Sequence, residues 1–482
     1  MHKVARSMNM HYISSRGGIA PVGFKDALLQ GFAADGGLFI PQQIPRFSRA
    51  ELEEMGSLGF TDLAYRLIRP YIPVDEIPDQ DLKELLLSSF ASFTDTRVAP
   101  VIRKGPDHFY IQELFHGPTQ SFKDIAMGFL VGCMDYFLQK DQKSLSLILA
   151  TTGDTGPAAV AAAAGKKSMN CWPLFPQSMI SEEQRRQMTT VDADNIHPVA
   201  VTECANGGDD LDIVVARMFN EPQTKSALKL SSVNSINWGR VMMQVVHYFS
   251  GYFQTVDSLD QKVIFSVPAG AFGNLCAGSI ARKMGLPVET FICATNQNQT
   301  LHQIFGQGRM HKNQLIQTVS SAIDIVLPYN FWRFLSLHSP DPSITKTVMD
   351  RFEQEGHIEF EPTLYHHFAQ GFSSVSVSDE QTLSTMRDFY HQYNYLLDPH
   401  GSVAVSAARE QQQKETPIIC MVTAHPAKFP DITSLALGEE VARENRHPAI
   451  EATMQKTETM HTCSCHELQE TLTELIQTLL AH

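Results

Sequence analysis

The chain has 482 residues, of which 43% are hydrophobic and 19% are charged. This composition is typical of a globular protein with two or three domains, and it excludes a disordered or collagen-like chain. Acidic residues exceed basic ones by 14, so the surface repels phosphates at long range and nucleic acid is not an expected partner. No apolar run approaches the roughly 18 residues that span a bilayer, which argues against a membrane protein.

The N-terminus and the cysteines indicate a cytoplasmic protein. Residues 1–18 contain no apolar core of the kind that secretory signals carry. Eight scattered cysteines are typical of reduced thiols rather than of a disulfide framework. The run 461–466 (HTCSCH) holds metal-ligating side-chain types, but a structural zinc site usually draws on two separated pairs. We therefore interpret this run as a tail segment with reduced thiols and predict no metal.

The elements, taken in chain order, predict an α/β protein. Residues 1–95 carry helical patterns near 60–68 and 80–93 and are expected to form a small leading domain. From residue 96 onward strand and helix patterns alternate, which is typical of sheets covered by helices on both faces. The predicted strands are 109–113, 145–150, 263–267, 288–294 and 418–423. Helices are predicted to begin near Ser121, after 156 and after 274, and a closing amphipathic helix spans 467–480.

Lys123 lies at the start of the first of these helices, in the loop 116–124 (HGPTQSFKD). The helix dipole disfavours a cation in a first turn, and lysines are more common in last turns. Beside Phe122, the amine would be partly desolvated, which lowers its pKa and supplies the neutral amine that Schiff-base chemistry needs. On this loop alone, a surface lysine beside a helix N-terminus is the simpler interpretation.

Two further loops link an apolar strand to a helix and can bind an anion on their backbone amides. Residues 151–157 (TTGDTGP) add three hydroxyl groups, and a structural turn and a binding loop are equally good interpretations of them. Residues 270–274 (GAFGN) lack the GxGxxG pattern of a dinucleotide fingerprint. Walker, Gly-x-Ser-x-Gly and His-Glu-x-x-His signatures are also absent from the sequence. A lysine with two anion-binding loops favours pyridoxal phosphate as the cofactor.

The loop around Lys123 resembles the cofactor-lysine motif of threonine synthases, and other segments match that family in order along the chain. An ordered set of motifs is far more specific than one motif, and this context indicates that Lys123 is the functional lysine. The matching segments extend over most of the chain and are 12–17, 35–41, 152–156, 234–238, 267–274, 398–401 and 423–429.

The resemblance implies the tryptophan-synthase-like fold (fold type II) of pyridoxal phosphate enzymes, with the cofactor between two α/β domains. A small N-terminal domain and a C-terminal helical tail would flank them. The implied units are 1–95 (N-terminal domain), 96–123 with 250–435 (large cofactor-binding domain), 124–249 (small substrate-side domain) and 436–482 (tail).

The resemblance also implies how the cofactor is held. Lys123 would bind it as an internal aldimine, and Asp154 would approach its phenolic oxygen. Thr423 would face the pyridine nitrogen through a neutral hydroxyl, which gives a milder electron sink than a carboxylate partner would. The residues implied around the cofactor phosphate are Gly270, Ala271, Phe272, Gly273 and Asn274.

The implied reaction converts O-phospho-L-homoserine and water into L-threonine and phosphate. Lys123 would move protons at Cα and Cβ, because a tethered amine lies beside both carbons. Thr151, Thr152 and Thr155 would bind the substrate carboxylate. A small-molecule substrate and a monomer or homodimer are the expected partners.

Two arginines are candidates for the substrate phosphate, since a guanidinium can hold phosphate oxygens bidentately. Arg333, with Asn330, is the first candidate, and Arg16, with Ser15, is the second. An ordinary ion pair is the alternative interpretation for either arginine.

The phosphate loop departs from the family pattern and leaves the activity open. Ala269 and Ala271 replace polar residues that are common in the family, Asn274 replaces an acid, and Gln299 replaces another. The vertebrate threonine-synthase-like proteins share the alanine at 271 and are linked to a phospho-lyase reaction that releases 2-oxobutyrate and ammonia. A phospho-lyase is therefore the alternative activity. A non-catalytic binding protein on the same fold is a further alternative, against which the retained Lys123 argues.

Overall fold

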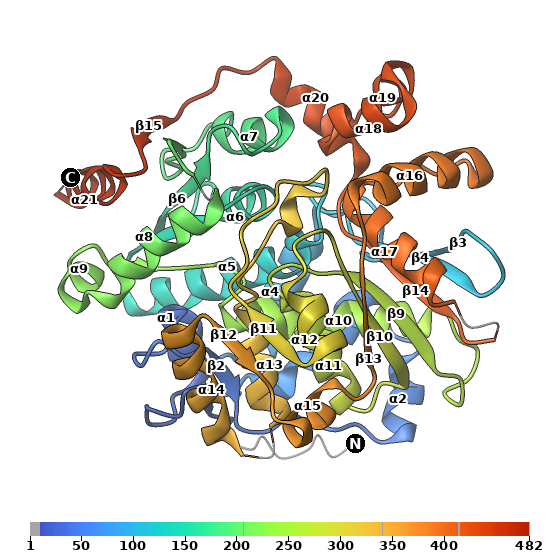
Figure 1. Cartoon of the computed structure of the whole chain (residues 1–482). Helices are drawn as coiled ribbons and strands as arrows, with labels where there is room; N and C mark the ends of the chain where they lie inside the picture. The colour runs from blue at the N-terminus through green and yellow to red at the C-terminus, as the bar shows by residue number, and fades with distance from the viewer. Residues whose placement is uncertain (1–9, 206, 340, 413–414, 482) are drawn as a thin grey trace.

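The computed structural model describes residues 10–205, 207–339, 341–412 and 415–481. In this part of the chain, two helix-covered sheets form the body of the molecule (Figure 1). The larger sheet has the strand order β13-β10-β9-β14-β4-β3 and is parallel except for its edge pair, β3 with β4. The smaller sheet, β15-β7-β6-β5-β8, is parallel throughout. The α/β fold that the alternating patterns predict is confirmed.

The predicted strands agree with the observed ones to within a residue or two at their ends. The larger sheet contains β3 (Val101–Arg103), β4 (Phe109–Glu113), β9 (Val263–Pro268), β10 (Val288–Thr295), β13 (Phe372–Ser376) and β14 (Ile418–Val422). The smaller sheet contains β5 (Leu145–Ala150), β6 (Met169–Pro176), β7 (Val199–Thr202), β8 (Leu230–Ser231) and β15 (His461–Ser464). Two antiparallel ribbons pair β1 (Tyr12–Ser14) with β2 (Phe39–Pro41) and β11 (Arg309–His311) with β12 (His357–Glu359).

Helices connect these strands and cover their faces. The helices of the first half are α1 (Phe24–Gln30), α2 (Arg49–Met55), α3 (Phe60–Ile68), α4 (Asp79–Phe90), α5 (Lys123–Asp141), α6 (Thr155–Ala163), α7 (Glu182–Thr189), α8 (Gly208–Asn220), α9 (Pro222–Ala227) and α10 (Trp238–Phe253). Those of the second half are α11 (Gly273–Lys283), α12 (Thr300–Gln307), α13 (Asn330–His338), α14 (Pro342–Glu355), α15 (Pro362–Ala369), α16 (Asp379–Tyr393), α17 (Pro399–Glu410), α18 (Pro430–Leu437), α19 (Glu439–Glu444), α20 (Pro448–Met454) and α21 (Leu468–Ala481). In the described ranges, none of them is both long and apolar enough to cross a bilayer.

The buried strands bring the three predicted loops together. Every residue of β5 and β9 is buried, as expected for apolar strands in parallel sheets with covered faces. Each strand leads into a helix: residues 114–122 join β4 to α5, residues 151–154 join β5 to α6, and residues 269–272 join β9 to α11. Because these loops leave the carboxyl ends of parallel strands, they are expected to meet at a crevice.

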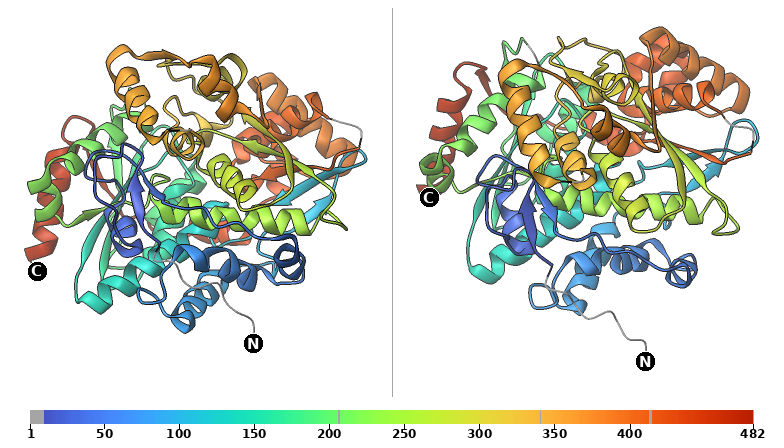
Figure 2. Two further views of the ribbon diagram at one scale, coloured as in Figure 1. Left: turned by 90° about the horizontal axis from the view of Figure 1, so that it is seen from below. Right: turned by 60° about the horizontal axis from the view of Figure 1, so that its bottom comes forward.

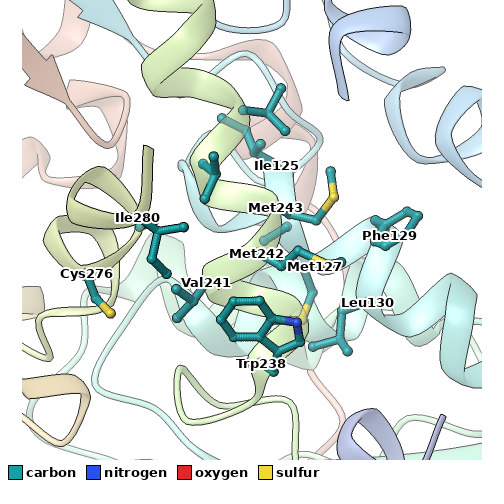
Figure 3. Close-up of a cluster of buried hydrophobic side chains, with 14 of the residues drawn as sticks. Ile125, Met127, Phe129, Leu130, Trp238, Val241, Met242, Met243, Cys276 and Ile280 are labelled. Atoms are coloured by element: carbon teal, nitrogen blue, oxygen red, sulfur yellow. The ribbon is translucent and has the colours of Figure 1, made fainter. Parts of the chain in front are cut away.

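The core that supports this crevice is built around α10, which is buried along almost its whole length. Its buried residues are mostly apolar, with Arg240, Gln244 and His247 among the polar exceptions. Figure 3 shows its side chains, among them Trp238, Val241 and Met242, between those of α5 and those of α11. This packing on both sides fixes the position of α5, whose first residue is Lys123.

The N-terminal helices pack against the same core. The predicted helices near 60–68 and 80–93 correspond to α3 and α4, and these pack against α10 and α5 on the underside of the molecule (Figure 2). The strands of the larger sheet all lie within 96–123 and 250–435, and those of the smaller sheet lie within 124–249 except for β15. The exact domain boundaries stay a prediction.

The tail is more than the helical segment that we predicted. The closing helix is present as α21, which lies beside α8 (Figure 1). However, the run 461–466 supplies β15, which pairs with β7 as the edge strand of the smaller sheet. Only Cys463 is buried in this short strand, and its other three residues are polar, so its hydrophobic pattern is too weak to recognise in the sequence. In the described residues, no cluster of three or more His, Cys, Asp or Glu side chains is arranged to hold a metal.

Candidate active site

A cavity of about 680 Å³ lies where the three loops meet. Lys123 from the start of α5, residues 151–155 from the loop after β5, and Ala271 from the loop after β9 all line it. Residues 234–236, part of another segment noted in the sequence, complete one wall. The three loops predicted to carry chemistry thus contribute to one site.

Lys123 has the environment of a reactive amine. Its side chain is partly buried, and Nζ lies 4.4 Å from the centre of the Phe122 ring. Burial, with the nearby cations Arg240 and Lys428, lowers the pKa of the Lys123 amine to about 7. Such an amine is substantially unprotonated at neutral pH and can act as a nucleophile or base.

Hydrogen bonds fix the loop that carries Lys123. The Phe122 backbone N–H donates to the Thr423 carbonyl oxygen at 2.8 Å, so Thr423 lies directly beside the lysine. The Asp124 carboxylate accepts from the Thr119 backbone N–H at 2.9 Å and from the Thr119 hydroxyl at 2.6 Å. Burial nevertheless raises the pKa of Asp124 to about 6.

Asp154 forms the buried ion pair of the site. Its carboxylate is 2.7 Å from Nζ of Lys428 and accepts a hydrogen bond of 3.0 Å from the Gln184 amide. Burial alone would raise the pKa of Asp154, but the charge of Lys428 outweighs it and holds that pKa below its ordinary value. Asp154 therefore stays ionised in the cavity wall. Lys428 also donates to the Thr119 carbonyl oxygen at 2.8 Å, which links this pair to the lysine loop.

The hydroxyl groups of the threonine loop, residues 151–155, have two different environments. The Thr151 hydroxyl accepts from the backbone N–H groups of Gly153 and Gly156 at 3.1 and 3.0 Å, so it shapes the turn. Thr152 and Thr155 line the cavity without such bonds among the described residues. Of the three predicted carboxylate ligands, these two have hydroxyl groups available for a ligand.

The loop after β9 presents backbone donors. Phe272 adopts φ 64 at the N-terminus of α11, and the backbone N–H groups of residues 270–272 have no acceptor among the described residues. A Cβ atom on Gly270 would lie 3.0 Å from the Ile323 Cα, so this close approach favours glycine. Free amides at a helix N-terminus form an anion site.

The Asn274 side chain, predicted to lie around the cofactor phosphate, contacts other residues of the protein. Its side-chain oxygen is 2.9 Å from the His247 ring, and its side-chain nitrogen contacts the Met421 sulfur. The Asn274 side chain therefore has partners within the protein on both its oxygen and its nitrogen.

The first candidate for the substrate phosphate, Arg333, lies away from the cavity. It is fully buried, and its guanidinium donates to the carbonyl oxygens of Phe39 and Ile236 and to the Asn330 side chain. Arg333 and Asn330 are three residues apart and therefore lie on one face of α13, which is turned into the protein. Neither Arg333 nor Asn330 is among the residues that line the cavity, whereas Tyr329, just before this helix, is.

Arg16 lines the cavity and replaces Arg333 as the candidate phosphate ligand. Its side chain is 15% exposed and forms ion pairs with Asp350, at 2.7 Å, and with Glu353. Its Nε has no acceptor among the described residues. Ser15 does not join it, because the Ser15 hydroxyl is buried and accepts from the Leu38 backbone N–H.

Sequence reasoning missed several residues of the site. Lys428 lies within a matched segment, but nothing in the sequence shows that a cation there pairs with Asp154. The cavity also receives acidic side chains, Asp209, Asp212 and Asp324, from elements far apart in the chain. Only their common position in three dimensions reveals them.

These residues fit pyridoxal phosphate. The cofactor's aldehyde needs an unprotonated amine, which Lys123 supplies, and its phosphate needs donors, which the free amides of 270–272 supply. The cavity of about 680 Å³ has room for the cofactor and a small substrate.

Comparisons with known families agree with this site. The family model described as "Pyridoxal-phosphate dependent enzyme" matches residues 94–424. Models described as "Threonine synthase N terminus" and "Threonine synthase, C-terminal" match residues 11–90 and 401–476. The chain is therefore a pyridoxal-phosphate-dependent enzyme.

Comparisons with individual proteins show to which family of pyridoxal-phosphate-dependent enzymes the chain belongs. A threonine synthase from Pseudomonas aeruginosa is 38% identical over 429 residues, covering 89% of this chain and 90% of the relative. Human threonine synthase-like 2 is 36% identical over 433 residues, covering 88% of each chain. The crystal structure of pyridoxal-phosphate-bound threonine synthase from Brucella melitensis gives a TM-score of 0.90 at 34% identity, with 97% and 99% of the two chains covered. The chain belongs to the threonine synthase family.

Proposed function

We propose that this chain acts as a threonine synthase, converting O-phospho-L-homoserine and water into L-threonine and phosphate. The observation that carries the proposal is the meeting of a weakly basic lysine, a threonine-rich loop and an arginine in one cavity. These groups suit the reacting carbons, the carboxylate and the phosphate of that substrate. The threonine synthases among the relatives support the same reaction.

The residues that would hold the cofactor follow from the site. Lys123 would bind it covalently, the amides of residues 270–272 would bind its phosphate, and Asp154 and Thr423 would face its ring substituents. When bound, pyridoxal phosphate supplies an electron sink for the substrate Cα. Asp154 stays ionised beside Lys428, so this position offers a fixed negative charge.

Lys123 would then serve as the proton carrier. Because the pKa of its amine is lowered to about 7, it can remove a proton from the substrate Cα and then one from Cβ near neutral pH, and protons return at Cγ and Cα. Packing of α5 against α10 restricts the lysine to short excursions. Phosphate leaves from Cγ, and water adds at Cβ.

The two ends of the substrate would be bound on opposite sides of this amine. Thr152 and Thr155 would donate to the carboxylate. Arg16 would bind the phosphate with its guanidinium, which lines the cavity and would be shared with Asp350 and Glu353. An arginine suits this task because its planar fork can engage a phosphate and a carboxylate together.

A product assay tests the proposal. Purified protein is mixed with pyridoxal phosphate and O-phospho-L-homoserine, and phosphate, threonine and 2-oxobutyrate are quantified together, with Lys123→Ala as the control. Threonine equal to the phosphate released is the expected result. Phosphate release by Lys123→Ala at the wild-type rate would overturn the role of the lysine.

The phospho-lyase is the second candidate, favoured by the apolar Ala271 in the phosphate loop. In that case 2-oxobutyrate would match the phosphate, and Ala271→Asn would shift the products toward threonine. A protein that takes up the cofactor but releases no phosphate would support the non-catalytic alternative. We further propose that the protein works in the cytoplasm on a small molecule, as a monomer or homodimer and without nucleic acid.

A further inference from the structure

Two thiols lie together at the edge of the smaller sheet, outside the cavity. Strand β7 ends at Thr202, and Glu203 then turns the chain with φ 62. This turn leaves the sulfur of Cys204 3.8 Å from the Val201 carbonyl oxygen and 3.9 Å from that of Thr202. Cys204 is thus folded back against the end of its own strand.

Cys465 reaches the same point from the tail. In the parallel pairing of β15 with β7, Ser464 lies opposite Thr202, and the next backbone N–H, that of Cys465, donates to the Thr202 carbonyl oxygen at 2.9 Å. The sulfur of Cys204 and the backbone of Cys465 therefore converge on one oxygen atom. The Cys465 side chain is also one of the neighbours that raise the pKa of the Cys204 thiol.

The remaining cysteines are placed differently. Cys463 is buried, and its thiol is hydrogen-bonded to Thr471. Five others are completely buried, whereas Cys204 and Cys465 are partly exposed. These two are therefore the thiols that a small oxidant can reach. The completely buried cysteines are Cys133, Cys171, Cys276, Cys293 and Cys420.

We propose that Cys204 and Cys465 form an oxidation site at which hydrogen peroxide converts the two thiols into a disulfide bond. The bond would join the tail covalently to the sheet that carries the threonine loop. This site is independent of the reaction proposed above.

The chemistry proceeds in two balanced steps. Burial and the neighbouring Cys465 raise the pKa of Cys204 to about 12, and in the proposed sequence Cys465 attacks first. The Cys465 sulfur bonds to one peroxide oxygen, and the O–O bond breaks. The other oxygen leaves as water, and Cys465 becomes a sulfenic acid. The Cys204 sulfur then attacks the Cys465 sulfur, the S–O bond breaks, and a second water carries away the thiol proton. The two thiols lose two electrons and the peroxide gains them.

The disulfide would secure a junction that also borders the cavity. The tail is held to the sheet by β15 and by three buried side chains of α21, Leu468, Leu472 and Ile476. On the other side, Gly208 follows Cys204 by four positions and packs directly against Thr152, since a Cβ on Gly208 would lie 2.5 Å from the Thr152 Cγ2. Oxidation would therefore act on a segment that leads into the substrate side of the cavity.

The test uses the full chain loaded with pyridoxal phosphate. The protein is treated with hydrogen peroxide, blocked with N-ethylmaleimide, digested, and mapped by mass spectrometry with and without a reductant. We expect a peptide that links Cys204 to Cys465, a loss of two hydrogen atoms per chain, and a parallel loss of maleimide label from both residues. A reductant should restore both labels. Proteolysis between α20 and β15 should release the tail from untreated protein but not from oxidised protein on a non-reducing gel.

Two variants sharpen the outcome. Cys463→Ser is the matched control, because it removes the third thiol of the region and should leave the linked peptide unchanged. Cys465→Ser should abolish it. A Cys204 that keeps its full label while Cys465 becomes a sulfinic acid would overturn the proposal, and so would a linkage that runs to Cys463. Both of these contradicting outcomes are measured on the wild-type chain and do not depend on the folding of a variant.

Discussion

Replacing Lys123 with methionine tests whether the protein holds this amine in a destabilising environment. The pKa falls from 10.5 to about 7 in the folded protein, which corresponds to about 5 kcal/mol at 1.36 kcal/mol per unit. Between these two pKa values the unfolded chain binds a proton that the folded chain does not. Wild-type stability should therefore rise with pH across this range, relative to Lys123→Met. Below pH 7 both states bind the proton, so the wild-type penalty is largest there and no longer changes with pH.

The measurement is denaturant unfolding of the cofactor-free proteins at pH 6, 7, 8 and 9.5. From pH 7 to 9.5 the lowered pKa alone would raise the wild-type free energy of unfolding by about 3 kcal/mol relative to Lys123→Met. Water in the cavity screens part of this effect, so we expect a relative gain of about 2 to 3 kcal/mol. Lys140→Met, which removes an exposed lysine from the same helix, is the matched control and should follow the wild type. Parallel curves for wild type and Lys123→Met from pH 7 to 9.5 would refute the lowered pKa.

Three further changes test other parts of the structure. Lys428→Met leaves Asp154 buried without its cation and should cost about 3–5 kcal/mol in denaturant unfolding at pH 7; an unchanged midpoint would contradict the pairing. Arg16→Gln should raise KM for the phosphorylated substrate about 10- to 100-fold, whereas Asp350→Asn, which keeps the guanidinium, should not. Leu472→Ala empties a buried position of α21 and should cost about 2–5 kcal/mol; a loss below 1 kcal/mol would mean that α21 is not packed there.

The sequence predicted the elements that depend on short-range patterns. The strands β5 and β9 are mostly apolar runs bounded by turns, and β4 and β10 contain shorter apolar stretches. The loops after β4, β5 and β9 carry glycine or threonine in recognisable order. Strand β15 was not predicted because an edge strand of four residues with a single buried side chain, that of Cys463, has little hydrophobic signal. Family resemblance, rather than spacing, located Asp154 and Thr423.

Which cations reach the site could not be predicted, because it depends on contacts between residues that are distant in sequence. Arg333 has the residue type of a phosphate ligand, but α13 turns it toward the carbonyl oxygens of Phe39 and Ile236, which are remote in sequence. Lys428 has no feature that marks it, yet it pairs with Asp154 across the junction of the two sheets. A buried cation must find acceptors, and which acceptors it finds is decided by the tertiary fold.

The charges of the site together explain how Lys123 is kept reactive. Asp154 is the neighbouring anion that would raise the pKa of Lys123, while Arg240 and Lys428 lower it. Because Lys428 is 2.7 Å from Asp154, it offsets the one charge that favours the ammonium form. The Asp124 carboxylate, one residue after the lysine, is occupied by two donors from Thr119. The carboxylates near the amine are therefore engaged with other groups and do not pair with Lys123. Burial can then lower the pKa of the amine to the range in which proton transfer at carbon is efficient.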